Sequence, residues 1–424
     1  MKPTDTVVAE RRSSPAIIRP RPLGLSAGKR GTRAIPRQTR NETIQDTDVD
    51  MGVEAGVEPE EMPSLARSGR GATLNPAIRF DSAETVLADD GWGTLDAEFS
   101  DLPALETVLI RDHSRTAIAR NNSPDVGFDR SINPYRGCEH GCVYCFARPS
   151  HAYLGYSPGL DFETKLLFKP EVASLLEKEL RRPSYRPKPI TLGANTDPYQ
   201  PVERRLRLTR QVLEVLLRFR HPVSIVTKSA NVLGDLDLLQ QLAELGLVHV
   251  FLSVTTLDPA LARIMEPRAS TPLLRLQALS ALAKAGVPAG VLAAPMIPGV
   301  NDTELEAILA ASAQHGALRA GYVMLRLPLE LREIFDSWLR THMPDRADRV
   351  LKLIREVRGG ALNDATFGQR FVGTGPYADL LAQRFARAAR QHNLAERMAP
   401  LDASLFRVPE TAREAQAPKQ MTLF

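Results

Sequence analysis

The sequence predicts an α/β fold in which parallel strands alternate with helices that cover the sheet. Short apolar runs of strand length recur between residues 131 and 330, and segments with helical periodicity separate them. Strands that alternate with helices in this way imply a parallel sheet. Gly246 and Gly286 follow two of the helical segments, where glycine commonly ends a helix. The chain has 424 residues, 43% of them hydrophobic, which is enough apolar surface for a large core.

The expected elements follow one another in regular order. Strands are predicted at residues 189–194, 223–227, 248–254, 289–295 and 322–327, with a sixth strand at a cysteine-containing loop near residue 138. Helices are predicted at residues 171–181, 206–219, 236–245, 272–285 and 303–315. This pattern gives six strand–helix units. Three further helices, at 331–340, 346–358 and 377–393, are expected to pack around them.

These elements divide the chain into five segments. Residues 1–75 are predicted to be a disordered tail, 76–130 an N-terminal extension, and 131–330 the α/β domain. Residues 331–395 are a helical C-terminal extension, and 396–424 a flexible tail that ends in a peptide motif. In the N-terminal extension, the apolar runs at 107–110 and 116–119 are expected to form a hairpin.

Charge is unevenly distributed in the N-terminal tail. Residues 1–40 hold ten basic and two acidic side chains, whereas residues 41–62 hold eight acidic side chains and no basic ones. The basic part suggests DNA binding, but the two parts neutralise each other, and a solvated tail is the simpler interpretation. The net charge of +4 permits a nucleic-acid partner without requiring one.

No apolar run approaches the length of a membrane span, and the first residues lead into no apolar stretch of the kind found in secretory signals. We therefore expect no membrane association. Thiols that are kept reduced for a metal site are typical of the cytoplasm, which is the predicted location.

All three cysteines of the chain, Cys138, Cys142 and Cys145, lie within eight residues, spaced Cys-x3-Cys-x2-Cys. A disulfide framework would need an even number of cysteines. A zinc site usually takes four nitrogen or sulfur ligands, and only His140 and His151 are near enough to complete one. Three thiolates on one loop can instead bind three irons of a [4Fe–4S] cluster, which usually has four cysteine ligands, and leave one iron open. An imidazole on that iron would block it, so we expect the histidines to serve packing or hydrogen bonding.

The cysteine spacing, with Tyr144 just before the last cysteine, resembles the signature of the radical S-adenosylmethionine (SAM) superfamily. The segments Ser131-Ile-Asn-Pro-Tyr-Arg-Gly137 and Asn195-Thr-Asp-Pro-Tyr-Gln-Pro201 resemble the spore photoproduct lyase-like branch. The resemblance implies a partial (β/α)6 barrel with one [4Fe–4S] cluster and SAM as cofactors. It also implies that the cluster cleaves SAM reductively to a 5′-deoxyadenosyl radical, which abstracts a hydrogen atom from the substrate.

Functional groups of such barrels gather at the carboxyl ends of the strands. The resemblance implies that Asn195 and Thr196 meet the ammonium group of SAM and that Lys228 faces its carboxylate. The Ser253 hydroxyl is expected to reach the carboxylate or the ribose, and Tyr144 is tied to the cluster loop. The alternatives are that Lys228 is a solvated lysine and that the hydroxyls cap helices. No residue stands out as the catalytic hydrogen donor.

Two arginines also follow strands. Arg268 comes after the fourth strand and Arg326 ends the sixth. For each, the sequence leaves open a contact with SAM or substrate and a structural ion pair.

The last five residues suggest a protein partner. Gln420, Leu423 and Phe424 follow a polar linker at 409–419 and resemble the peptide by which bacterial replication and repair proteins bind the sliding clamp. Leu423 and Phe424 would fill an apolar pocket while Gln420 forms a hydrogen bond at its rim. The alternative is an apolar chain end without a partner.

Three functions compete at this point. The first is a radical SAM enzyme that acts on nucleic acid, in DNA repair or base modification, with an electron donor such as flavodoxin or ferredoxin. The second is a radical SAM enzyme that modifies a protein, a tRNA or a small molecule. The third is a non-catalytic iron–sulfur module of a repair complex.

One expectation concerns the cysteines that are missing. Spore photoproduct lyase uses a further cysteine as hydrogen donor to the product radical, but all three cysteines here are expected to bind the cluster. The reconstituted protein should therefore not repair the spore photoproduct efficiently, as measured by recovery of the intact thymine dinucleotide from a dinucleotide that carries the lesion. Rapid and clean repair would contradict this reading.

Overall fold

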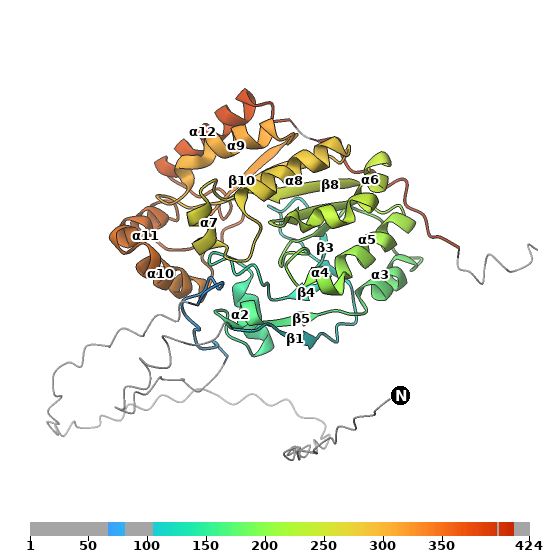
Figure 1. Cartoon of the computed structure of the whole chain (residues 1–424), viewed down its shortest axis with the longest axis horizontal. Coiled ribbons are helices and arrows are strands. Elements are labelled where there is room, and N and C mark those ends of the chain that lie inside the picture. The colour runs from blue at the N-terminus through green and yellow to red at the C-terminus, as the bar shows by residue number, and fades with distance from the viewer. Residues whose placement is uncertain (1–66, 81–104, 397, 411–424) are drawn as a thin grey trace, which may run out of the picture. The chain divides into compact units, whose positions relative to one another are not determined.

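A seven-stranded sheet forms the centre of the computed structural model, which describes residues 67–80, 105–396 and 398–410 (Figure 1). The strand order is β10-β9-β8-β7-β6-β3-β2, and only β2 runs antiparallel to its neighbour. The strands are β2 (Ile118–Arg120), β3 (Arg130–Ile132), β6 (Ile190–Leu192), β7 (Val223–Thr227), β8 (Val248–Ser253), β9 (Ala289–Met296) and β10 (Ala320–Met324). The six parallel strands confirm the predicted partial barrel.

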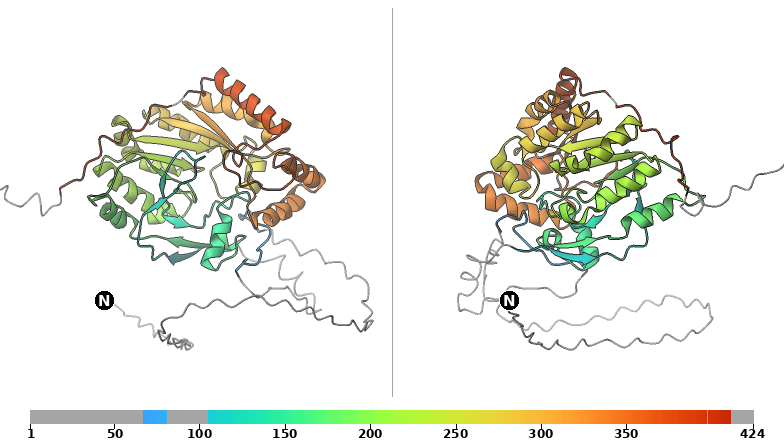
Figure 2. Two further views of the ribbon diagram at one scale, coloured as in Figure 1. Left: turned by 180° about the vertical axis from the view of Figure 1, so that it is seen from behind. Right: turned by 45° about the vertical axis from the view of Figure 1, so that its right-hand side comes forward.

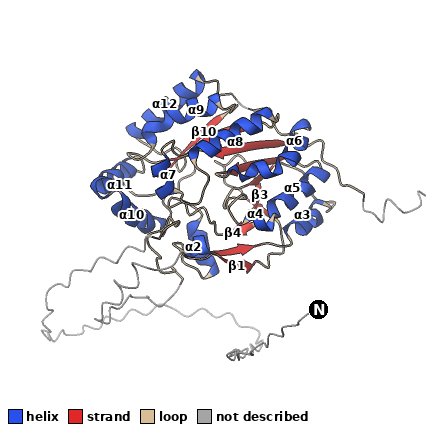
Figure 3. Ribbon diagram, in the orientation of Figure 1, coloured by secondary structure: helices blue, strands red, loops and turns tan. Residues whose placement is uncertain are grey.

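Helices cover the outer side of this sheet (Figure 3). They are α3 (Val172–Leu180), α4 (Glu203–Leu206), α5 (Leu208–Arg218), α6 (Leu236–Glu244), α8 (Pro272–Lys284) and α9 (Leu305–Gln314). Helix α7 (Pro259–Met265) instead packs beside the cysteine loop, where Leu261 and Met265 share an apolar cluster with Val143. The longer ones lie within a few residues of their predicted positions, whereas the short helices α4 and α7 were not predicted. In α5, Val212, Leu213 and Leu216 are fully buried on one face, which is the helical pattern that places this segment against the sheet.

Short 3₁₀ segments connect several elements. They are η1 (Arg148–Leu154), η2 (Ala230–Asp235), η3 (Asp302–Glu304) and η4 (Pro344–Arg346). The first of these directly follows the cysteines, and the second lies between β7 and α6.

The C-terminal helices build a second apolar core beside the cysteine loop. Helices α10 (Leu331–His342) and α11 (Ala347–Glu356) bury Phe335, Trp338 and Ile354 in one cluster with Cys142, Val143 and Tyr144. Helix α12 (Pro376–Gln391) instead packs beside α9 (Figure 2). The helical extension therefore supports both the barrel and the loop that carries the cysteines.

The predicted N-terminal hairpin is wrong. Strand β1 (Val108–Arg111) pairs in parallel with β5 (Lys165–Phe168), which also pairs with β4 (Tyr135–Arg136) in a separate small sheet. Strand β2 pairs with β3 at the edge of the barrel sheet. Proximity along the chain suggested that these runs pair with each other, but each pairs with a strand that follows later in the chain.

The folded part extends beyond two predicted boundaries. Residues 67–75 were assigned to the N-terminal tail, yet Ala72 is fully buried and Thr73 forms a 2.8 Å hydrogen bond with Ser337. In the C-terminal tail, the Phe406 ring packs against Tyr185 and Phe219. The rest of the predicted N-terminal tail and the peptide at Gln420–Phe424 lie outside the described residues. Among the described helices, none has the length and apolar character needed to cross a membrane.

Candidate active site

The three cysteines lie on a loop that is fixed by backbone hydrogen bonds to other parts of the fold. The loop follows β4, and Cys138 N–H donates to the Phe162 carbonyl at 2.9 Å. Val143 N–H donates to the Met265 carbonyl at the end of α7 at 3.1 Å. A tight turn brings Cys145 N–H to the Cys142 carbonyl at 3.2 Å, so the loop is held from both sides and within itself.

The thiols are withdrawn from water and lie close to one another. Cys138 and Cys142 are buried and Cys145 is half-buried. Burial raises the pKa of all three thiols, that of Cys142 to about 12, and the neighbouring cysteines raise the pKa of Cys138 further. Three thiolates are therefore unfavourable here unless a cation compensates them.

The grouping does not suit a single ion. Within the described ranges, no three His, Cys, Asp or Glu side chains converge on one metal position. Tetrahedral zinc needs four ligands at bonding distance from one centre. A cluster whose irons each take a different thiolate has no such requirement.

A buried ion pair stabilises the cysteine loop. The Arg148 guanidinium and the Glu163 carboxylate are both fully buried and meet at 2.5 Å. Arg148 also donates to the carbonyls of Gly141 at 3.2 Å, Cys142 at 2.9 Å and Gly159 at 2.8 Å. One charged side chain thus accounts for several loop carbonyls that would otherwise be unpaired in the interior.

The same carboxylate binds the N-terminal segment to the loop. Glu163 accepts hydrogen bonds from Gly71 N–H at 3.0 Å and Ala72 N–H at 2.8 Å. Gly71 lies so close to the loop that a Cβ atom would stand 1.8 Å from the Gly141 carbonyl oxygen. Gly141 itself has φ +66°, a conformation that favours glycine. Both glycines are therefore required by this contact.

The second motif, residues 195–201, braces the loop from the other side. The Gln200 side chain is fully buried; its oxygen accepts from Glu139 N–H at 2.8 Å and its amide donates to the Gly137 carbonyl at 3.3 Å. The Thr196 hydroxyl donates to the Tyr135 carbonyl at 2.8 Å. Both contacts fix backbone on either side of Cys138.

Asp197 connects this motif to the next strand. Its carboxylate lies 3.3 Å from His140 Nδ1 and accepts from the Thr227 hydroxyl and Lys228 N–H, both at 2.7 Å. Burial opposes the charged form, but His140 and the other donors hold the pKa of Asp197 at about 2. The ionised carboxylate therefore ties the cysteine loop to the end of β7.

Tyr144 is held by a buried network that the sequence did not predict. Its hydroxyl donates to Glu266, which also accepts from Thr255 and forms an ion pair with Arg275. Burial opposes ionisation of Glu266, yet Arg275 lowers its pKa, so the carboxylate stays charged. The available signal was Arg275 itself, which lies on the apolar face of α8 with Leu279 and Leu282 and so implied a buried partner.

Lys228 lies beside these groups. Its ammonium nitrogen is 5.7 Å from the centre of the Tyr144 ring, and its charge lowers the pKa of Cys142 and Cys145. Among the described residues, its ammonium group has no hydrogen bond or ion pair. The structure therefore brings Lys228, Tyr144 and the cysteines together.

The other residues predicted to contact SAM form hydrogen bonds within the protein. Asn195 is exposed, and its N–H donates to Asn133 Oδ1 at 3.2 Å. The hydroxyl of Ser253 donates to the Ala294 carbonyl on the adjacent strand at 2.9 Å, and that of Thr196 is bound as described above. The role of these three residues in SAM binding stays a prediction.

The two histidines near the cysteines contact other groups. His140 faces Asp197, and His151 is fully buried against the rings of Tyr156 and Phe162, with centroids 5.5 Å away in both cases. Arg268 forms an ion pair with Glu139 at 3.2 Å, which makes it a structural partner of the loop. Arg326 has no such pair among the described residues.

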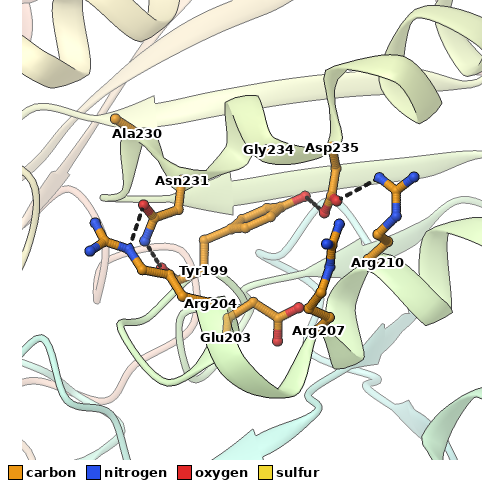
Figure 4. A pocket seen from close by; sticks show the side chains of 9 residues that line it. All are labelled: Tyr199, Glu203, Arg204, Arg207, Arg210, Ala230, Asn231, Gly234 and Asp235. Carbon is orange, nitrogen blue, oxygen red and sulfur yellow. Dashed lines mark hydrogen bonds and ion pairs between the residues drawn. The ribbon is translucent and has the colours of Figure 1, made fainter.

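A cavity of about 370 Å³ lies near the second motif but contains none of the cysteines (Figure 4). Residues of 199–210 and 230–235 line it, including three arginines. Arg204 donates to Asn231 at 3.1 Å, and Arg210 pairs with Asp235 at 3.0 Å and Asp237 at 2.7 Å. Because these donors are largely used within the protein, the cavity resembles a structural brace more than a reaction site.

Comparison with known proteins agrees with this geometry. A family model described as the radical SAM superfamily matches residues 132–311. An uncharacterized protein of Mycobacterium tuberculosis is 36% identical over 307 residues, which cover 72% of this chain and 84% of that protein. The chain belongs to the radical SAM superfamily. An uncharacterized protein of Methanocaldococcus jannaschii is 28% identical over 174 residues, which cover 41% of this chain and 62% of that protein.

The fold is also similar to that of a solved structure. A mutant of spore photoproduct lyase superposes with a TM-score of 0.51 at 16% sequence identity, over 68% of this chain and 80% of that chain. The expected resemblance to this branch is thereby confirmed at the level of the fold. As a radical SAM enzyme, the protein uses a [4Fe–4S] cluster and SAM, and it is not merely a binding module.

The residues present fit these cofactors. Three thiols share one loop, and His140 faces Asp197. His151 packs against aromatic rings, and its two ring nitrogens have no hydrogen-bond partner among the described residues. The three thiols are therefore the donors that the loop offers to a cluster. A cluster bound by three thiolates keeps one iron available for SAM. The ammonium group of Lys228 lies beside Tyr144 on the cysteine loop. It can offset negative charge on the thiolates or on a carboxylate.

The Arg148–Glu163 pair gives a direct test of loop support. Glu163→Gln leaves the buried Arg148 charge without its anion and turns an acceptor into a donor that faces backbone N–H groups. We expect a loss of about 3–5 kcal/mol in the free energy of unfolding, measured by urea unfolding of the full chain, together with reduced iron retention.

The control for this experiment is Glu177→Gln. Glu177 pairs with Arg181 and Arg218 at the surface, with 28% of its side chain exposed. Its removal should change stability by no more than about 1 kcal/mol. Equal effects of the two substitutions would contradict the role assigned to Glu163.

Proposed function

We propose that Cys138, Cys142 and Cys145 bind a single [4Fe–4S] cluster and that the protein uses SAM to abstract a hydrogen atom from a nucleic acid. The observation that carries the first part is the loop itself, on which two buried thiols and one half-buried thiol lie together. Among the described residues, no fourth protein ligand joins them. When bound, the cluster supplies the electron that cleaves SAM to methionine and a 5′-deoxyadenosyl radical. A reducing partner such as flavodoxin or ferredoxin provides that electron.

The protein's own residues would hold SAM beside the loop. Lys228 is the cation available for the methionyl carboxylate, because its ammonium group has no acid partner among the described residues. The hydroxyl of Tyr144 is bound to Glu266, and its ring lies beside the ammonium group of Lys228. Asn195, Thr196 and Ser253 would contribute backbone and side-chain groups around the rest of SAM. The buried second core excludes water from one side of the loop.

The nucleic-acid assignment rests on the fold and on one exposed ring. The similar structure named above is a lyase that is named for a photoproduct. Phe146 directly follows Cys145, and 47% of its surface is exposed. An exposed aromatic ring beside the cluster can stack on a nucleobase, as in proteins that bind single strands.

This proposal predicts a specific chemical outcome. The anaerobically reconstituted full chain, given a reductant and SAM, should release 5′-deoxyadenosine, whereas Cys142→Ala should reduce release to background. Addition of deuterated oligonucleotides should transfer deuterium into the 5′-deoxyadenosine, as measured by mass spectrometry. Tyr153→Phe, at an exposed ring outside the proposed site, should behave as the wild type.

The outcomes separate the alternatives. Release without deuterium transfer from any DNA or RNA would favour a protein or a small molecule as the substrate. Absence of release from protein that contains iron and sulfide would contradict the proposed chemistry.

We also propose that Gln420, Leu423 and Phe424 bind the sliding clamp, which would bring the enzyme to replicating or repaired DNA. The residue pattern supports this, and the peptide lies outside the described residues. Deletion of residues 420–424 is expected to abolish co-purification with the clamp while SAM cleavage is retained. Unchanged co-purification would overturn the proposal.

A further inference from the structure

Arg326 lies just beyond the carboxyl end of a barrel strand, close to the cysteine loop, and has no structural ion pair among the described residues. It follows β10, the last parallel strand, by two residues. Its guanidinium carbon lies 5.7 Å from the centre of the Phe146 ring and 5.0 Å from that of Phe371. Because Phe146 is adjacent to Cys145, these contacts place the guanidinium group next to the cysteine loop.

The donors of Arg326 are not used by the protein. Its Nε atom is buried and has no hydrogen-bond partner, and no described residue forms a hydrogen bond or an ion pair with the rest of the group. A buried donor without a partner is uncommon and costs free energy in the unbound protein. The two aromatic rings fix the guanidinium group but supply no acceptor for its N–H groups.

The neighbouring charges do not neutralise it. Arg370 stacks on Phe371 with its guanidinium carbon 4.8 Å from the ring centre, but it pairs with Asp125 at 2.5 Å. Arg358 is buried and donates to the carbonyls of Met324 and Leu325. Burial and then the charge of Arg370 lower the pKa of Arg326, and the charge of Asp125 only partly offsets this by raising it. The cluster therefore has an excess of positive charge. Among the described residues, the guanidinium group of Arg326 has no hydrogen-bond partner, whereas Arg358 lacks a partner only at its buried Nε atom.

This differs from two of the three arginines that line the cavity of Figure 4. There, Arg204 and Arg210 are bound to Asn231, Asp235 and Asp237. The guanidinium groups of Arg204 and Arg210 form hydrogen bonds and ion pairs within the protein. The guanidinium group of Arg326 is positioned by two aromatic rings, but its N–H groups have no acceptor among the described residues. Such an arrangement is that of a binding group prepared for an anion.

We propose that Arg326 binds a phosphodiester of the nucleic-acid substrate, with Phe146 stacking on an adjacent base. This inference rests on the proposed function and assigns a recognition residue to it. The planar fork of arginine matches two phosphate oxygens, and an exposed ring beside a phosphate contact suits an unpaired nucleotide. Because Phe146 follows Cys145, a nucleotide bound in this way would lie next to the cluster.

The test measures binding of fluorescein-labelled single-stranded DNA and RNA oligomers of one sequence to the full reconstituted chain, by anisotropy at several salt concentrations. Arg326→Gln should weaken binding about tenfold and reduce the slope of log K against log salt by roughly 0.7, the value for one phosphate contact. Arg326→Lys keeps the charge without the planar fork, and should retain the slope while it binds less tightly than the wild type.

The matched control is Arg349→Gln, which removes the same charge from an exposed position in the first turn of α11. It should leave affinity and slope within twofold of the wild type. If the wild type binds an oligomer and Arg326→Gln binds it with the same affinity, the inference is overturned. The same holds if Arg326→Gln and Arg349→Gln lose affinity equally. Either result leaves the proposed function standing. A wild-type chain that binds neither oligomer would instead contradict the nucleic-acid assignment itself, and the difference between the two oligomers tells which source of phosphodiester is preferred.

Discussion

The structure depends on buried carboxylates that hold one short loop in place. Glu163, Asp197 and Glu266 are largely withdrawn from water, and each meets a basic side chain, namely Arg148, His140 and Arg275. Each carboxylate also accepts hydrogen bonds from the backbone or from hydroxyl groups near the cysteines. Isolated buried charges are costly, so these pairs exist only where the geometry satisfies every group. The result is a loop whose thiols cannot easily move apart.

This arrangement separates structural cations from cations that are left for ligands. Arg148 and Arg275 are fully buried and paired with carboxylates, and Arg268 pairs with Glu139. Lys228 and Arg326 lie beside the same loop but have no acid partner among the described residues. Such unpaired cations are the groups that can bind an anionic cofactor or substrate, and they lie next to Tyr144 and Phe146 respectively.

Much of the fold follows from the sequence because its signals are local. Alternation of apolar runs and helical periodicity gives the order of strands and helices, and the spacing of three cysteines gives the metal-binding loop. The hairpin prediction was wrong because a strand can pair with a segment that is distant in the sequence, as β1 does with β5. The buried ion pairs were also missed, since Glu163 and Arg148 look like surface charges in a sequence. Only Arg275, on an apolar helical face, gave a signal that a partner must be buried.

The central claim is that three cysteines bind one cluster and leave an iron open to SAM. Electron paramagnetic resonance of the reduced protein, with and without SAM, tests it most directly. We expect the signal of a single [4Fe–4S] cluster that changes when SAM is added. A spectrum that SAM leaves unchanged, or anaerobically prepared protein that contains zinc in place of iron, would contradict it.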